Sequence, residues 1–438
     1  MSVLASAEPK LASGGSDPAI SAGLYYKKVC SRKTLRRAWR VVHSNGISSD
    51  KEETRRLVKE FNISIETHLD RIYRQLFKSK FRFPPSEGIP IPRKGKKPRP
   101  LVKSPIESRI VQRAILEVLQ SAPELDPYYK NSTSFGGIKG EGLGVPGAVK
   151  TVYEMIAAGA KYYVRSDIDS FFTKIPRKIV LAKISAAISD HKFECLLEKA
   201  TDVELENLSR LGSSASLFPS YEIGVAQGCC LSPLLGNILL EDFDRELNGR
   251  GIACIRYIDD FIVLGPNKRK VVAAFESGLR ILARHGLTAY DPNLSTDKSS
   301  MGEIRHGFEF LGCSIRPGMI SPAGKSRRRV VETVKTELDK SLVLLDRPEQ
   351  LRRDDLAAVN TLHGVSNILE GWGNQYAFCN DREVLKQLDS EVNGLIENYL
   401  KAISRKYGKF MAEKNLMACR RLLGVHLLMD SKFSPIVA

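Results

Sequence analysis

The chain lacks the cysteine patterns of a disulfide-rich secreted domain and of a zinc site. Its eight cysteines, at positions 30, 195, 229, 230, 254, 313, 379 and 419, form no CxxC pair and no Cys/His cluster with zinc-ligand spacing. We therefore expect reduced, mostly buried thiols. Long apolar runs are also missing, because no stretch approaches the roughly 20 residues that span a bilayer, and no cleavable signal precedes the fold. These absences predict a soluble cytoplasmic protein with no membrane partner.

Acidic residues are fewer than basic residues. Lys and Arg number 67 against 50 Asp and Glu, which gives a formal net charge of +17. An excess of this size favours a polyanionic partner such as nucleic acid, and the clustering of the cations weakens the alternative of an evenly solvated basic surface. With 438 residues, 42% of them hydrophobic, the chain is long enough for two or three domains or subdomains.

Residues 93–103 contain six cations and no acid, interrupted by one glycine and two prolines. The segment is too charged to lie in a core, and it predicts a mobile basic loop that grips phosphates. A solvated turn is the alternative. The cations are Arg93, Lys94, Lys96, Lys97, Arg99 and Lys103.

An adjacent acidic pair, Asp259 and Asp260, lies between two apolar runs in residues 254–264. Such a pattern predicts a β-hairpin with the carboxylates at its tip. Two neighbouring like charges repel each other unless a cation lies between them, which favours a divalent metal. A plain acidic turn is the alternative, because Asp suits turns.

Further parts of such a site occur elsewhere in the chain. Residues 162–172 indicate a buried strand that brings Asp167 near its end, as a third carboxylate from a separate strand. Glycine-rich residues 134–144 match neither phosphate-loop fingerprint and are a weak signal for a nucleic-acid contact. Residues 224–240 begin as a loop of small residues, and Ser232 before Pro233 predicts a helix with Ser232 as its N-cap.

In this order and spacing, the motifs resemble those of bacterial reverse transcriptases of the group II intron and retron-like lineage. Residues 257–260 (Tyr-Ile-Asp-Asp) match the YxDD box, Asp167 with Phe171 and Phe172 matches the first acidic motif, and residues 227–237 match the QGxxxSPxLxN motif. Lys298 and residues 310–312 fall where later palm motifs are expected. Residues 97–101 and 109–112 resemble fingers motifs, and residues 371–376 resemble the start of a thumb.

The resemblance implies an α+β right-hand polymerase with fingers, a palm built on an antiparallel sheet, and a helical thumb. We expect a flexible N-terminal tail over residues 1–22, N-terminal helices and fingers over 23–160, a palm with finger insertions over 161–318, and a helical thumb and C-terminal region over 319–438.

The resemblance also assigns roles to residues. Asp167, Ile168, Asp259 and Asp260 would hold two Mg²⁺ ions, with Mn²⁺ as a substitute, and Asp259 is the stronger ligand of the tip pair. Lys298 would protonate the leaving group. Lys97 and Arg99 would contact the incoming triphosphate, Gln227 would border the nascent base pair, and Phe172 would exclude the ribose 2′-hydroxyl. Core packing is the alternative for both aromatics. The nucleic-acid contacts would be Arg93, Lys94, Lys96, Lys103, Arg327, Arg328 and Arg329.

These features predict an RNA-directed DNA polymerase that extends a primer with dNTPs on an RNA template and releases a cDNA product. No endonuclease motif, RNase H-like acidic set or DNA-binding module is present, and the Asn-Ala-x-x-His and Val-Thr-Gly signatures of retron enzymes are missing. We therefore expect a stand-alone, defence-associated enzyme that copies a cognate non-coding RNA, by analogy. A maturase-like splicing protein and a retron-type enzyme that makes multicopy single-stranded DNA are the alternatives.

Overall fold

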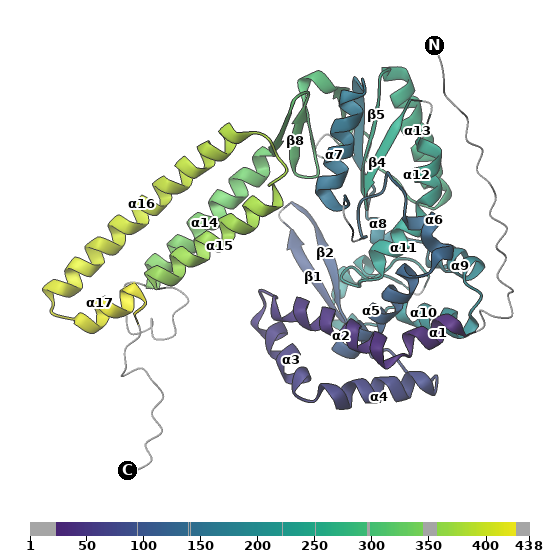
Figure 1. Cartoon of the computed structure of the whole chain (residues 1–438), viewed down its shortest axis with the longest axis horizontal. Coiled ribbons are helices and arrows are strands. Elements are labelled where there is room, and N and C mark those ends of the chain that lie inside the picture. Colours follow the sequence, from purple (N-terminus) through teal and green to yellow (C-terminus); the bar gives the residue numbers. More distant parts are fainter. Residues whose placement is uncertain are drawn as a thin grey trace. The chain divides into compact units, whose positions relative to one another are not determined.

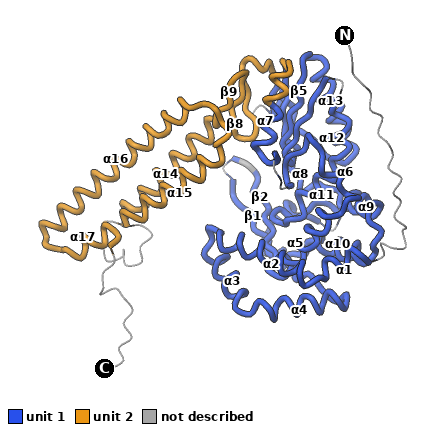
Figure 2. The backbone as a smooth tube through the Cα atoms, in the orientation of Figure 1, with its two compact units in different colours: residues 1–152, 162–301 blue, residues 153–161, 302–438 orange. Residues whose placement is uncertain are grey.

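The computed structural model describes residues 23–425 apart from positions 94, 139, 141, 221, 250, 296–297 and 345–356, with only the main chain of Lys96 (Figure 1). The expected N-terminal tail over residues 1–22 and the expected phosphate contact Lys94 therefore lie outside the described residues. The chain forms two compact units (Figure 2). The first comprises residues up to 152 together with 162–301, and the second comprises residues 153–161 and those from 302 onward.

Most helices of the first unit share one hydrophobic core with its central sheet. Ile110 and Ile115 on α5, Phe243 on α12 and Phe261 on the sheet are all buried in it. The helices are α1 (Leu24–Val29), α2 (Arg32–Ile47), α3 (Glu52–Ile63), α4 (Ile65–Phe77), α5 (Ile106–Gln120), α6 (Asp126–Tyr129), α8 (Phe171–Lys174), α9 (Arg177–Ala187), α10 (His191–Thr201), α11 (Ser232–Leu239), α12 (Glu241–Leu247) and α13 (Lys268–Arg284). Helix α7 (Gly144–Ala157) continues past residue 152.

The central sheet has four strands in the order β4–β5–β3–β6. They are β3 (Tyr162–Asp167), β4 (Ala253–Tyr257), β5 (Asp260–Gly265) and β6 (Ser300–Glu303), and β5 pairs antiparallel with both β3 and β4. Phe261, Ile262 and Val263 of β5 are fully buried, as expected for an inner strand with both faces covered. The predicted hairpin at residues 254–264 is confirmed. The predicted buried strand over residues 162–172 is confirmed only as far as Asp167, because Phe171–Lys174 form helix α8.

The basic segment is a β-hairpin, so the prediction of a loop is wrong, while its contact with phosphates stays a prediction. Strand β1 (Glu87–Arg93) pairs antiparallel with β2 (Lys96–Lys103), with Ile89 opposite Leu101 and Pro90 opposite Pro100. A two-stranded ribbon has only edge strands, so proline costs it few ladder hydrogen bonds. Because this ribbon tolerates proline, a segment whose composition is typical of a loop can still form strands.

The second unit joins a small sheet to a group of long helices. Its strands are β7 (Phe308–Phe310), β8 (Cys313–Arg316) and β9 (Met319–Pro322), and the central strand β8 pairs antiparallel with both others. Its helices are α14 (Gly324–Leu344), α15 (Ala358–Gln375), α16 (Arg382–Ala412) and α17 (Leu416–Leu423). Val334, Leu338, Val392 and Tyr399 contribute to a separate core, in which the Ser341 hydroxyl and the Tyr399 hydroxyl are 2.8 Å apart.

All eight cysteines lie in the described part of the chain, and none forms a disulfide, as the sequence predicts. Among the described helices, none is both long enough and apolar enough to span a bilayer.

Candidate active site

Two strands of the central sheet bring three aspartates together, Asp167, Asp259 and Asp260, which we call the acidic group. The register places Asp167, the last residue of β3, opposite Asp260, the first residue of β5. Asp259 precedes it in the turn between β4 and β5, and its carbonyl accepts a 3.1 Å hydrogen bond from the Ile168 amide. Main-chain pairing therefore holds Asp167 next to the hairpin tip: β3 pairs with β5 up to Asp260, and Ile168 bonds Asp259.

Ile168 lies beside the acidic group but offers only its main chain to it. The side chain is 1% exposed and belongs to the core of the first unit. A contribution of Ile168 to metal binding would therefore come from its carbonyl oxygen.

Burial and neighbouring carboxylates raise the pKa of both aspartates at the hairpin tip. Burial and the neighbouring Asp167 raise the pKa of Asp259 to about 6. Burial, together with Asp167 and Asp259, raises the pKa of Asp260 to about 7. Both shifts mean that ionising the pair is costly without a counter-charge, which is the electrostatic condition that favours cation binding.

Lys298 supplies one counter-charge. Its ammonium forms a salt bridge with Asp167, and both side chains are largely shielded from solvent. Burial disfavours the ammonium form, but the hydrogen bond to Asp167 and the attraction of all three carboxylates raise the pKa of Lys298 overall. Lys298 is therefore next to the acidic group, and its role as a proton donor stays a prediction.

The acidic group could supply some of the ligands of a divalent cation, with water and substrate phosphates supplying the rest. Within the described residues, no group of three His, Cys, Asp or Glu side chains could by itself hold a metal ion. Mg²⁺ commonly takes one or two carboxylates and completes its shell with water and substrate phosphates. Asp167 and Asp260 face each other in register and both aspartates of the tip carry raised pKa values, so the residues present fit that mode.

The raised pKa of Asp260 predicts a pH-dependent gain in stability on replacing it. Between pH 4 and 7 the folded protein holds a proton that the unfolded chain releases, so stability falls as the pH rises through this range. In EDTA at pH 8 we expect Asp260→Asn to raise Tm by roughly 2–4 °C, with a smaller gain at pH 5. Thermal melts at both pH values measure this.

The matched control is Asp291→Asn, which removes an exposed carboxylate of the same unit whose Oδ1 accepts from the Asn293 amide. Asp291 is exposed and is not one of the three clustered aspartates, so its replacement should not relieve the repulsion among them. An Asp260→Asn variant that gains no more at pH 8 than at pH 5 would show that the carboxylates do not repel each other as described.

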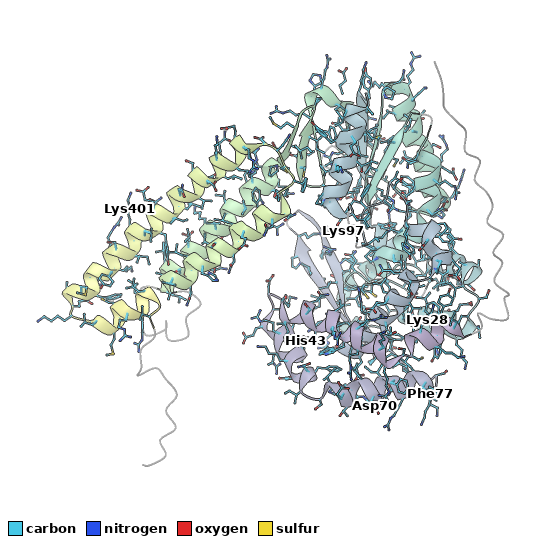
Figure 3. The ribbon with its side chains drawn as sticks, in the orientation of Figure 1. Lys28, His43, Asp70, Phe77, Lys97 and Lys401 are labelled. Atoms are coloured by element: carbon cyan, nitrogen blue, oxygen red, sulfur yellow. The ribbon has the colours of Figure 1, made fainter. Side chains whose placement is uncertain are left out.

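Arg99 and Gln227, far apart in the sequence, are hydrogen-bonded partners. Arg99 Nε donates to Gln227 Oε1 at 3.0 Å, and the Val102 amide donates to the Gln227 carbonyl at 2.8 Å. The Gln227 loop therefore runs alongside strand β2. Lys97 lies two residues before Arg99 and is exposed (Figure 3); alternate residues of a strand share a face. The structure thus joins two of the four predicted nucleotide contacts, Arg99 and Gln227, and places a third, Lys97, on the same strand as Arg99.

Helix α11 after this loop begins one residue earlier than predicted, so the assignment of Ser232 as its N-cap is wrong. Ser232 is the first helical residue, and its hydroxyl donates to the Ala226 carbonyl at 2.7 Å. The hydroxyl therefore ties the start of the helix to the residue before Gln227 and makes no cap with its own helix.

Phe171 and Phe172 have different environments. Phe171 is 2% exposed and packs in the core, so core packing is its confirmed role. Phe172 is only partly buried, its ring centroid is 5.4 Å from that of Phe171, and its carbonyl accepts a 2.7 Å hydrogen bond from the Val225 amide. This bond links the Phe172 backbone to the Gln227 loop, while a gating role for its ring stays a prediction.

The other predicted nucleic-acid contacts are more dispersed. Arg93 is exposed, and its Nε donates to the Lys97 carbonyl at 3.0 Å within the β1–β2 hairpin. Lys103 contacts Glu53 and Glu87 at 3.4 and 3.5 Å, so its charge is partly offset. Arg327, Arg328 and Arg329 belong to α14 in the second unit. Contact of these side chains with nucleic acid stays a prediction.

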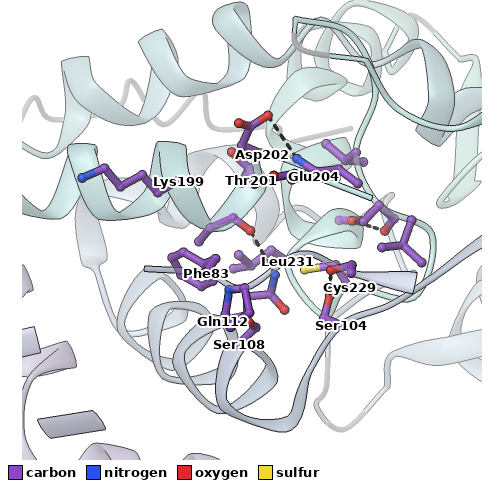
Figure 4. A pocket seen from close by; sticks show the side chains of 18 of the residues that line it. Phe83, Ser104, Ser108, Gln112, Lys199, Thr201, Asp202, Glu204, Cys229 and Leu231 are labelled. Atoms are coloured by element: carbon purple, nitrogen blue, oxygen red, sulfur yellow. Dashed lines mark hydrogen bonds between the residues drawn. The ribbon is translucent and has the colours of Figure 1, made fainter. Parts of the chain in front are cut away.

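The first unit contains a cavity of about 320 Å³ (Figure 4). Its walls include Phe83, Gln112 and Leu231, and it shares Val102 of β2 and Ala226 with the surroundings of Gln227. None of the three aspartates lines it, so its size does not make it the active site.

The sequence did not reveal the buried side chains beneath the hairpin tip. Arg256 on β4 and Asp244 on α12 form a salt bridge at 2.5 Å, with both side chains almost fully buried. A single arginine inside an otherwise apolar strand was the available signal. Glycine-rich residues 134–137 also contact the tip, because a Cβ on Gly136 would lie 2.5 Å from the Ile258 side chain. A nucleic-acid contact of the glycine-rich segment remains untested.

The sequence matches one protein family and two curated relatives. Residues 91–315, just over half of the chain, match the family described as "Reverse transcriptase (RNA-dependent DNA polymerase)". "Protein YkfC" of Escherichia coli K12 is 26% identical over 265 residues, which are 52% of this chain and 66% of that protein. An "Uncharacterized 91 kDa protein in cob intron" of Schizosaccharomyces pombe is 28% identical over 178 residues, 40% of this chain and 20% of that protein. The matches thus span less than two thirds of either relative.

Solved structures with partial similarity include two telomerases. Apo telomerase from Candida tropicalis, truncated from the C-terminal domain, has a TM-score of 0.40 at 12% identity and covers 55% of each chain. Telomerase from Candida albicans in complex with a fragment of telomeric RNA has a TM-score of 0.39 at 12% identity, covering 82% of this chain and 62% of that one. A partial Cas6-RT-Cas1–Cas2 complex has a TM-score of 0.34 at 22% identity, covering 58% and 41%.

Proposed function

This chain belongs to the reverse transcriptase family and has its α+β right-hand polymerase fold, and from that premise we propose that it is an RNA-directed DNA polymerase. It adds dNTPs to a primer 3′-hydroxyl on an RNA template and releases cDNA. The observation that carries this proposal is the meeting of Asp167 with Asp259 and Asp260 across two paired strands. Acidic ligands from separate strands are what a shared metal site for phosphoryl transfer requires.

The acidic group would hold Mg²⁺, or Mn²⁺ in its place, through Asp167, Asp259, Asp260 and the main chain of Ile168. When bound, two such ions activate the primer hydroxyl and offset the charge of the triphosphate. Lys298 holds its proton firmly while paired with Asp167, so to protonate the departing pyrophosphate it must exchange this partner for a phosphate oxygen.

Nucleotide selection is assigned to residues around the Gln227 loop. Arg99 and Lys97 on one strand would contact the triphosphate through charge-assisted hydrogen bonds. Gln227, which already accepts a hydrogen bond from Arg99, would border the nascent base pair. Phe172, whose backbone is bonded to the same loop, would stand against a ribose 2′-hydroxyl.

The template and product would follow basic surfaces on both units. In the first unit these surfaces would include Arg93 and Lys103 of the β1–β2 hairpin, with Lys94 and Lys96 as further cations of the same sequence segment, and in the second the start of α14 with its three arginines. Such contacts neutralise phosphates without reading sequence. They support RNA and cDNA as partners, and the eight free thiols support a reducing, cytoplasmic location.

We propose that the template is a cognate non-coding RNA and that the enzyme serves antiphage defence. The support is the departure of Ala226, Cys229 and Cys230 from the usual intron-protein wording of this loop. A maturase-like role is the second candidate, and it is favoured by the relative encoded in a cob intron. Splicing that is unaffected by loss of the three aspartates would support that second role.

Primer extension by the purified full-length chain tests the enzymatic proposal. With Mg²⁺, dNTPs and a primed RNA we expect cDNA of template length, and with EDTA none. Nucleic acids that co-purify with the protein should be sequenced in the same experiment. One structured RNA with matching cDNA supports a cognate template, and a heterogeneous RNA population contradicts it. Absence of cDNA on both added and co-purified RNA would overturn the polymerase proposal.

A further inference from the structure

The salt bridge beneath the hairpin tip has an unusual geometry. Arg256 is fully buried, and its Nε and Nη2 donate to the two carboxylate oxygens of Asp244 at 2.7 and 2.5 Å. This two-pronged pairing fixes the plane of the guanidinium. The remaining nitrogen, Nη1, donates to Asn237 Oδ1 and to the carbonyl of Ile258, both at 2.9 Å. The guanidinium therefore ends on the peptide group that immediately precedes Asp259.

That peptide group belongs to a strained residue. Ile258 has a φ of 62°, in the left-handed region. Among the described non-glycine residues with positive φ, Ile258 alone is β-branched, and this side-chain type is disfavoured there. Strain of this kind persists only where the surroundings over-determine the conformation, and it concentrates at functional sites.

A second set of bonds holds the turn from the other side. Asn237 Nδ2 donates to the Gly136 carbonyl at 2.8 Å, and Gly136 lies against Ile258. The main chain of β4 also pairs with this loop, because Arg256 donates to the Thr133 carbonyl at 2.8 Å and accepts from the Phe135 amide at 2.9 Å. Arg256 makes the two main-chain bonds itself and is linked to Asn237 through its guanidinium.

We propose that Arg256 is a positioning residue of the active site, acting with Asp244 and Asn237 to hold the Ile258 peptide in its left-handed conformation. The conformation of Ile258 sets the direction in which the Asp259 and Asp260 side chains point. The proposal rests on the proposed polymerase function. Arg256 is fully buried and its guanidinium bonds Asp244, Asn237 and the Ile258 carbonyl, so it acts through the turn. A buried ion pair is often no more stabilising than an apolar pair of similar volume, so stability alone gives no reason for a charged pair at this position.

A double variant separates positioning from folding. Arg256→Met alone leaves the Asp244 carboxylate buried without its partner and should lower Tm strongly. Adding Asp244→Leu removes that unpaired charge and should restore most of the Tm, because Asn131, the other partner of Asp244, is partly exposed and can bond to water. The bond to the Ile258 carbonyl stays absent. We expect kcat for primer extension to remain about 10- to 100-fold below wild type, with KM for primer–template little changed.

Hydrogen exchange gives a readout that is independent of activity. The Ile168 amide, bonded to the Asp259 carbonyl, and the amides of residues 254–264 should exchange about tenfold faster in the double variant. Arg177→Met is the matched control, because Arg177 is also buried but bonds the carbonyls of Thr201 and Ser220. It should lower Tm without changing exchange at the hairpin tip.

The outcomes are distinguishable. A double variant with restored Tm, wild-type kcat and wild-type exchange overturns the proposal. If wild type makes no cDNA but the tip of the double variant still exchanges faster, positioning stands and the polymerase function fails. Should the double variant not regain its Tm, Arg256→Lys decides. Its single ammonium cannot grip both Asp244 oxygens and the Ile258 carbonyl, so unchanged exchange at the tip in that variant would also overturn the proposal.

Discussion

Replacing Asp259 by Asn should abolish DNA synthesis while leaving the fold intact. Asn has the shape of Asp but lacks the charge that would bind a divalent cation, and loss of such a ligand removes several kcal/mol of transition-state stabilisation. We expect turnover to fall by at least about 10³-fold. Because burial and Asp167 raise the pKa of Asp259, the variant should melt at the same temperature as wild type or higher. Primer extension on RNA, together with a thermal melt, measures both effects.

Asp167→Asn should have a similar effect on turnover, with one difference. It also removes the salt-bridge partner of Lys298, so Tm should not rise in that variant. Asp291→Asn serves again as the control and should retain wild-type turnover. Activity of Asp259→Asn within tenfold of wild type, in a folded protein, would show that the tip carboxylates are not catalytic.

Replacing Phe172 by Ala should let the enzyme accept ribonucleotides. Phe172 lies five residues after Asp167, and its backbone is bonded to Val225 in the Gln227 loop. This bond ties the Phe172 backbone to the loop of the residue that would border the base pair, and a ring that stands against the ribose there is the proposal that the variant tests. Removing it should lower the preference for dNTPs over rNTPs by roughly 10- to 200-fold, the range that steric discrimination of one small group supplies. Single-nucleotide incorporation with dNTP and rNTP pairs gives the ratio of kcat/KM values.

Two variants separate gating from packing. Phe172→Tyr keeps the ring and should keep the dNTP preference. Phe171→Ala removes a ring that is 2% exposed, so it should destabilise the protein by about 3–5 kcal/mol with little effect on the preference of the folded fraction. An unchanged dNTP preference in Phe172→Ala would assign that ring to packing alone.

Much of the active site could be predicted from local pattern. The hairpin around Asp259 and Asp260 follows from two apolar runs that flank an acidic pair, and the strand before Asp167 follows from its own apolar run. Periodicity and turn chemistry are local properties, so they survive without knowledge of the fold. The same local reasoning failed at residues 93–103, because charge and proline content cannot show whether a partner strand is present.

Amino-acid order alone therefore determined which chemical groups the protein carries and which short elements hold them, including the acidic tip, the third aspartate and Lys298. Only the tertiary structure decided that Asp167 faces Asp260, that Arg99 bonds Gln227, and that Arg256 and Asp244 are buried together beneath Ile258. These pairings join residues up to 128 positions apart. Their geometry depends on strand register and on how helices cover the sheet, and both are set by the packing of the whole unit.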